Sequence, residues 1–186
     1  MRGSMRLLSA VLTIAAASFI AACGGGGGGG GGPTQPPPPS VTFIPAGAAG
    51  SNSVSLQSGT VSLTTLELNL TLQAVPGLYG LAFDLDFPAG ALRFAGASEG
   101  SALASAGVPL LVQTSESSSG HLVVGLSRTG NSGGIASASG IAMTLRFEVI
   151  AAGGGAIAFT RNHALDHAGG EVLGVTWTGG SVTVVR

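Results

Sequence analysis

The chain of 186 residues has no lysine, a single cysteine and few charged side chains, which make up 8% of the sequence. Its seven arginines form no cluster, so there is no basic patch of the kind that binds nucleic-acid phosphates. The same absence argues against electrostatic binding to anionic lipid head groups. One cysteine cannot form a disulfide within the chain.

A hydrophobic run long enough to cross a membrane as a helix is also missing. The longest run, Leu7 to Ala22, has sixteen residues, whereas a spanning helix needs about 20. It follows Arg2 and Arg6 and ends in small residues, which is the pattern of a secretory signal peptide over residues 1–22. The mean hydropathy of +0.52 therefore does not indicate an integral membrane protein.

The cysteine directly follows this segment. The tetrad Ile20-Ala21-Ala22-Cys23 resembles the lipobox of bacterial lipoproteins, in which the cysteine is lipidated and becomes the first residue of the mature chain. The resemblance implies an exported protein that is anchored to the bacterial cell envelope by lipid on Cys23 alone. The alternative is an ordinary thiol after a conventional Ala-x-Ala cleavage site. The remaining chain has five arginines and eight acidic residues, hence a net charge of −3.

Residues 23–40 cannot build a core. Gly24 to Gly32 form an unbroken glycine run, and four prolines occupy positions 36–39. The glycine run is expected to behave as a random coil of about 17 Å, and the prolines favour a stiffer extended helix. We predict a disordered tether over residues 23–40.

Residues 41–186 have the length of one domain, and their apolar pattern has a period of two. Apolar residues alternate with polar or small ones over 66–72, 81–87, 122–126, 141–149 and 182–184, which indicates half-buried strands. Shorter candidate strands are 41–44, 54–57, 110–114, 156–160 and 172–177. Turn-forming clusters separate them, and Gly100–Ala106 could form at most one helical turn. We predict an all-β domain, an antiparallel sandwich of jelly-roll-like, immunoglobulin-like shape with about nine strands.

Polar residues suited to catalysis are sparse. Asp84 and Asp86 lie two apart on a predicted strand, so both carboxylates project from one face. Paired carboxylates can cleave glycosidic bonds, but neighbours on one strand point in parallel rather than across a cleft. We interpret them as a solvated strand face, with Arg146 as a partner, and predict no catalytic residues.

His163, Asp166 and His167 form an H-x-x-D-H motif in a predicted loop, a pattern that could hold a metal. Structural zinc sites use more and softer ligands, so we predict no metal and no cofactor. Tyr79 and Trp177 are the only aromatic residues with a polar group, and such rings can form sugar-binding platforms. We favour packing for Trp177.

Other motifs are incomplete. Ser127 lacks the second glycine of a G-x-S-x-G nucleophile elbow, and the glycine run has no lysine for a phosphate-binding loop. Asn69-Leu70-Thr71 matches a glycosylation sequon, which we discount because it lies in the middle of a predicted strand.

From about Ser53 onward the chain resembles a cohesin module, the receptor module of cellulosome scaffolds, and more broadly the carbohydrate-binding modules of the same β-sandwich superfamily. Three segments carry the resemblance: Leu78–Phe87 followed by Leu92, Gly140–Val149, and Leu165–Val172 with Gly180–Val184. In the last of these, Asp166 is expected to be a turn residue of the closing hairpin. Phe87-Pro88 departs from the family, which typically has Tyr-Asp there.

The resemblance implies a lipid-anchored, non-catalytic binding module of cohesin type, not an enzyme. Its expected partner is a polysaccharide or a dockerin-like protein involved in polysaccharide breakdown, and the ligand-binding residues cannot be assigned from the sequence. The alternative is a structural lipoprotein of the envelope or of a secretion apparatus that mediates protein–protein assembly.

Overall fold

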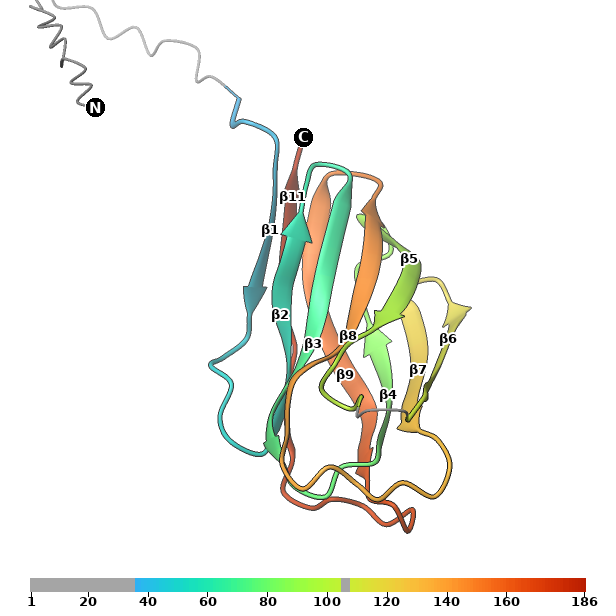
Figure 1. The fold of residues 1–186 in the computed structure, drawn as a ribbon. Helices are drawn as coiled ribbons and strands as arrows, with labels where there is room; N and C mark the ends of the chain where they lie inside the picture. Colours follow the sequence, from blue (N-terminus) through green and yellow to red (C-terminus); the bar gives the residue numbers. More distant parts are fainter. Residues whose placement is uncertain (1–35, 105–107) are drawn as a thin grey trace, which may run out of the picture. The chain divides into compact units, whose positions relative to one another are not determined.

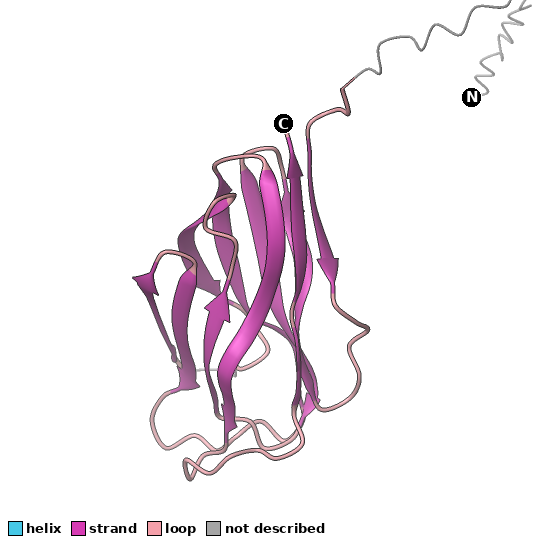
Figure 2. Ribbon diagram, turned by 180° about the vertical axis from the view of Figure 1, so that it is seen from behind, coloured by secondary structure: helices cyan, strands magenta, loops and turns pink. Residues whose placement is uncertain are grey.

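The computed structural model describes residues 36–104 and 108–186. Pro36–Arg186 form one compact unit. The predicted signal peptide, Cys23 and the tether up to residue 35 lie outside the described residues. The regular structure of the described part is entirely β-strand (Figure 2). Within that part, no helix has the length and apolar character needed to cross a membrane.

Two sheets pack face to face (Figure 1). The six-stranded sheet has the order β1-β11-β9-β4-β7-β6, and the five-stranded sheet has the order β10-β2-β3-β8-β5. The bounds are β1 Ser40–Pro45, β2 Ser53–Val61, β3 Thr65–Val75, β4 Gly80–Asp86, β5 Leu92–Glu99, β6 Leu110–Ser118, β7 His121–Arg128, β8 Ala138–Val149, β9 Gly153–Leu165, β10 Thr176–Thr178 and β11 Gly180–Val185.

This arrangement confirms the predicted all-β sandwich. The described residues form eleven strands rather than about nine. All neighbouring pairs of strands are antiparallel except β10, which runs parallel to β2.

The core lies between the sheets, because each sheet turns one apolar face inward. Strand β3 contributes Leu66, Leu68, Leu70 and Leu72, all fully buried. The six-stranded sheet contributes alternate residues of its neighbouring strands β4 and β7, which are almost fully buried: Leu81, Phe83, Leu85, Leu122, Val124 and Leu126. The alternation read from the sequence therefore identifies the inward faces of β3, β4 and β7.

Two differences from the predicted strands come from β-bulges. Ile141 was expected on the apolar face of its strand, but it is 38% exposed. The register shifts between Leu70 and Thr71 of the neighbouring strand β3, and this reverses the faces of β8 before Met143. Strand β5 was missed because a second shift, between Phe94 and Gly96, interrupts its alternation.

One further predicted strand differs in its bounds. The strand expected over 172–177 is reduced to Thr176–Thr178, which pairs with β2. The segment Gly100–Ala106, which could form at most one helical turn, contains no helix in its described part, residues 100–104.

Arg128 at the end of β7 is an unexpected buried charge. Its side chain lies on the inward side and is only 5% exposed. The guanidinium Nη1 donates a hydrogen bond to the carbonyl oxygen of Leu103 at 2.6 Å. This bond ties the segment after β5 to β7.

Candidate functional site

The outward side chains of β6, β7, β4 and β9 form one continuous surface, which we call the outer face. Strand register places them in rows across the sheet. One row is Leu111, Ser127, Gly80 and Leu165, the next is Gln113, Gly125, Ala82 and His163, and a third contains Ser115, Val123 and Asp84. Small residues occupy its centre, and the exposed apolar side chains Leu111 and Val123 flank them.

The small residues leave a hollow of about 330 Å³ on the outer face. Gly80, Ala82 and Gly125 line it together with Leu111 and Leu165. A Cβ atom at Gly125 would meet nothing within 4 Å, so the missing side chain leaves open space there. Strand glycine often marks a place where another backbone or a ligand approaches closely.

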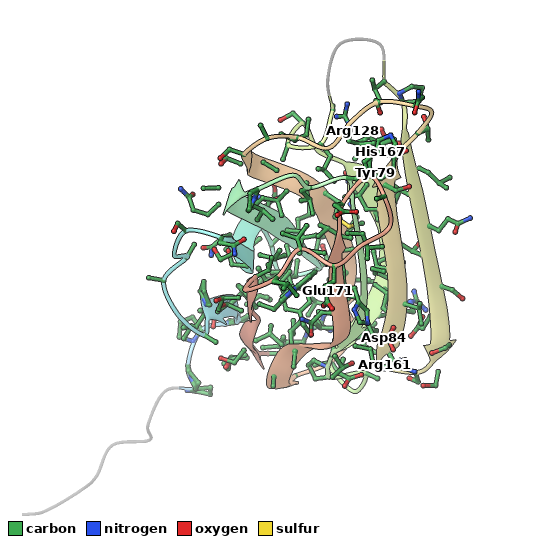
Figure 3. The ribbon with its side chains drawn as sticks, turned by 90° about the horizontal axis from the view of Figure 1, so that it is seen from below. Tyr79, Asp84, Arg128, Arg161, His167 and Glu171 are labelled. Atoms are coloured by element: carbon green, nitrogen blue, oxygen red, sulfur yellow. The ribbon has the colours of Figure 1, made fainter. Side chains whose placement is uncertain are left out.

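The rim of the hollow is held in place by local contacts. The rings of Tyr79 and His167 lie side by side with their centres 5.2 Å apart (Figure 3). The Tyr79 hydroxyl donates to the carbonyl oxygen of Gly130 at 3.0 Å. Asp166 Oδ1 accepts hydrogen bonds from the amides of Ala168 at 2.9 Å and Gly170 at 2.8 Å. Asp166 is thus a turn residue, as expected from the resemblance.

These contacts also show what the H-x-x-D-H motif does. His163 lies at the end of β9 rather than in a loop, with its Nδ1 3.4 Å from a carboxylate oxygen of Glu171. His167 contacts Tyr79, and Asp166 binds backbone amides, so the three side chains have separate partners. Among the described residues, no three His, Cys, Asp or Glu side chains are grouped to hold a metal.

An ionic cluster of Asp84, Asp86, His121 and Arg161 lies at the other end of the outer face. His121 Nδ1 is 2.5 Å from Asp86 Oδ1, and its Nε2 is 3.2 Å from Asp84 Oδ2. Arg161 forms an ion pair with Asp84 (Figure 3). A bulge of β9 opposite Ala82 and Asp84 supports this pair, and Arg161 itself has a φ of 46°, a strained value for a residue with a side chain.

The cluster confirms that Asp84 and Asp86 share a strand face and corrects their environment. Asp84 is buried, with 6% exposure, so the face is not uniformly solvated. Arg146 is not their partner, because it belongs to the other sheet and forms an ion pair with Glu67 at 3.0 Å. Sequence reasoning missed His121 and Arg161.

The two carboxylates change the acid–base behaviour of His121. The hydrogen bond to Asp86 is the largest effect and raises the pKa of His121 above its ordinary value of 6.5. Burial opposes this shift, whereas the charges of Asp86 and Asp84 add to it. An opposite charge at this distance favours the protonated ring.

The outward face of the five-stranded sheet has a different character. Its polar side chains pair with one another, as in the hydrogen bond from the Thr144 hydroxyl to Asn69 Oδ1 at 2.8 Å. Arg93 and Glu148 form a further ion pair there. The sequon residue Asn69 lies in the middle of β3, as predicted.

The remaining sequence candidates have structural roles. Trp177 packs against Phe83 and Phe159, with ring centres 5.7 and 5.1 Å apart, which confirms the packing prediction. Ser127 lines the hollow, and its strand position is opposite Gly80.

No protein-family model matches the chain, and no curated protein matches its sequence. Solved structures do match. One is the sixth cohesin of scaffoldin B from Acetivibrio cellulolyticus in complex with the Cel5 dockerin; it has a TM-score of 0.55 and 18% identity over 75% of this chain and 96% of that chain. The fold is cohesin-like.

Two further structures agree. A complex of the dockerin CaDoc0917 with the cohesin CaCohA2 gives a TM-score of 0.55 and 16% identity, covering 78% of this chain and 100% of the matched chain. The solution structure of CaCohA2 from Clostridium acetobutylicum gives 0.54 and 19% over 73% and 92%. At these identities the likeness concerns the cohesin-like fold.

Proposed function

We propose that this chain is a non-catalytic docking module whose outer face holds a dockerin-like protein. The observation that carries the proposal is the hollow between Gly80, Ala82 and Gly125, which exposed Leu111 lines, with exposed Val123 in the adjacent row of the outer face. Two of the structurally similar cohesins are bound to dockerins, and this supports the choice of partner.

The geometry of the outer face suits a protein partner. Leu111 is 49% exposed and Val123 39%, and they lie on neighbouring strands across Gly125 and Ser127. Apolar side chains around a hollow, with charged groups beside them, resemble the centre and rim of a protein–protein interface. The small central residues let a partner approach the backbone, and the hollow can receive one of its side chains.

Polysaccharide binding has less support from the aromatic residues. Trp177 packs on Phe83 and Phe159, and the Tyr79 ring contacts His167. Sugar platforms use exposed aromatic faces, whereas these rings contact other side chains. A polysaccharide is therefore the competing outcome in the binding test.

The binding test uses paired variants with matched exposure. Leu111→Asp places a charge on the outer face, whereas Leu63→Asp places one in the loop after β2, where Leu63 is 51% exposed. Titration calorimetry against purified dockerin modules is expected to show binding that Leu111→Asp weakens at least about tenfold. Leu63→Asp should bind like the unchanged protein. Binding of soluble polysaccharides in place of every dockerin, or equal effects of the two variants, would refute the proposal.

We also propose that lipid on Cys23 anchors the module to the cell envelope. The support is the lipobox-like tetrad and the short apolar run before it. Mass spectrometry of the membrane fraction is expected to find a mature chain that begins at Cys23 and carries acyl groups. Cys23→Ser should remove that form, and an unmodified wild-type chain that is recovered only outside the membrane fraction would contradict the anchor.

A further inference from the structure

His121 contacts two carboxylates through its two ring nitrogens. The register of β4 and β7 places His121 opposite Asp86, and Asp84 opposite Val123 of the outer face. Only the doubly protonated ring can donate a hydrogen bond to both Asp86 and Asp84. The cluster can therefore hold an imidazolium between two carboxylates.

Charged groups from three strands surround this ring. Strand β4 supplies Asp84 and Asp86, and β9 supplies Arg161, whose Nη2 is 3.4 Å from His121 Nε2. Glu116 at the end of β6 accepts a hydrogen bond from the amide of Gly120, next to His121, at 3.4 Å. The four members of the ionic cluster sum to zero charge with His121 protonated and to −1 with the neutral ring.

The change in the charge of His121 affects a carboxylate that a partner can reach. The Asp86 side chain is 52% exposed, and the Asp84 side chain only 9%. Arg161 already forms an ion pair with Asp84, so Asp86 is the carboxylate of the cluster that a partner can reach. When the ring is protonated, His121 competes for this carboxylate.

We propose that His121 makes docking at the outer face pH-dependent, because the protonated ring neutralises the charge of Asp86, whereas the neutral ring leaves that charge to a cationic side chain of the partner. This inference rests on the proposed function. The rest of the outer face supports a cationic partner, because Asp166 lines the hollow and Glu171 lies beside His163, so carboxylates outnumber the exposed guanidinium of Arg161. Binding strengthens as pH rises.

The first test needs no partner. Nitrogen-15 NMR of the assigned histidine rings is expected to show His121 losing its proton above pH 6.5, and Asp86→Asn should lower that midpoint. The His163 and His167 signals of the same sample serve as controls and should not move with Asp86→Asn. A His121 midpoint at or below 6.5, or one that Asp86→Asn leaves unchanged, overturns the inference whatever the protein binds.

The second test uses a lysine octamer as a cationic probe at low salt. Between pH 5.5 and 8.5 its affinity should rise more for the wild type than for His121→Gln, by about threefold, the effect of one unit charge at about 6 Å in water. The comparison of variants removes the contributions of His163 and His167. Equal rises in the two proteins overturn the inference, and they leave the calorimetric test with dockerins unaffected.

Discussion

Replacing Phe147 with alanine is expected to lower the free energy of unfolding by about 3–5 kcal/mol. Phe147 is fully buried on β8, between β3 and β5. Its ring meets those of Phe87 and Phe94, with centres 5.1 and 5.8 Å apart. Alanine would leave a cavity in the core, because the three packed strands cannot shift to fill it. The loss is a large share of the about 5–15 kcal/mol that stabilises a typical domain.

Urea unfolding followed by circular dichroism measures this loss. Ile141→Ala is the matched control on the same strand, because Ile141 is 38% exposed and its removal should change stability by at most about 0.5 kcal/mol. A cost below about 1 kcal/mol for Phe147→Ala, or equal costs for the two variants, would contradict the position of the core.

Replacing Gly125 with phenylalanine is expected to weaken dockerin binding by about thirtyfold or more, with the fold retained. The new side chain would occupy the hollow that we assign to a partner side chain, and loss of such a central contact typically costs at least about 2 kcal/mol. Its Cβ would meet no atom within 4 Å, so the barrier to binding comes from the filled hollow. Calorimetry with a dockerin measures the affinity, and thermal unfolding checks the fold.

Gly134→Ala serves to separate an effect on stability from an effect on binding. A Cβ there would lie 2.1 Å from the carbonyl oxygen of Gly77, so this variant should lose stability. Gly125→Ala should remain as stable as the wild type and bind with intermediate affinity. Unchanged binding by a folded Gly125→Phe variant would exclude the hollow as part of the interface.

The period-two pattern predicted the faces of most strands, because an antiparallel sheet with one buried face requires that alternation. It failed where a bulge inserts a residue. Ile141 and Gly96 mark two such places, and the shift depends on the neighbouring strand as well as on the residue itself. A single strand's sequence does not contain that information.

The candidate site was harder to predict from the sequence, because its contacts also depend on the neighbouring strands. The common face of Asp84 and Asp86 follows from their spacing, but their partners follow from strand pairing. From the sequence alone, Arg146 and Arg161 are equally plausible partners of the two aspartates. Only the order of strands places Arg161 beside Asp84 and Arg146 beside Glu67. The contact of Tyr79 with His167 likewise joins the start of β4 to the turn after β9.

Photo-cross-linking tests the outer face most directly. Benzoylphenylalanine replaces Val123 on the outer face or Ile141 on the five-stranded sheet, whose exposures are 39% and 38%. Each variant is irradiated with purified dockerin modules, and the products are identified by mass spectrometry. Docking at the outer face predicts a covalent dockerin adduct from position 123 and none from position 141. Adducts from position 141 alone, or from neither position, would contradict it.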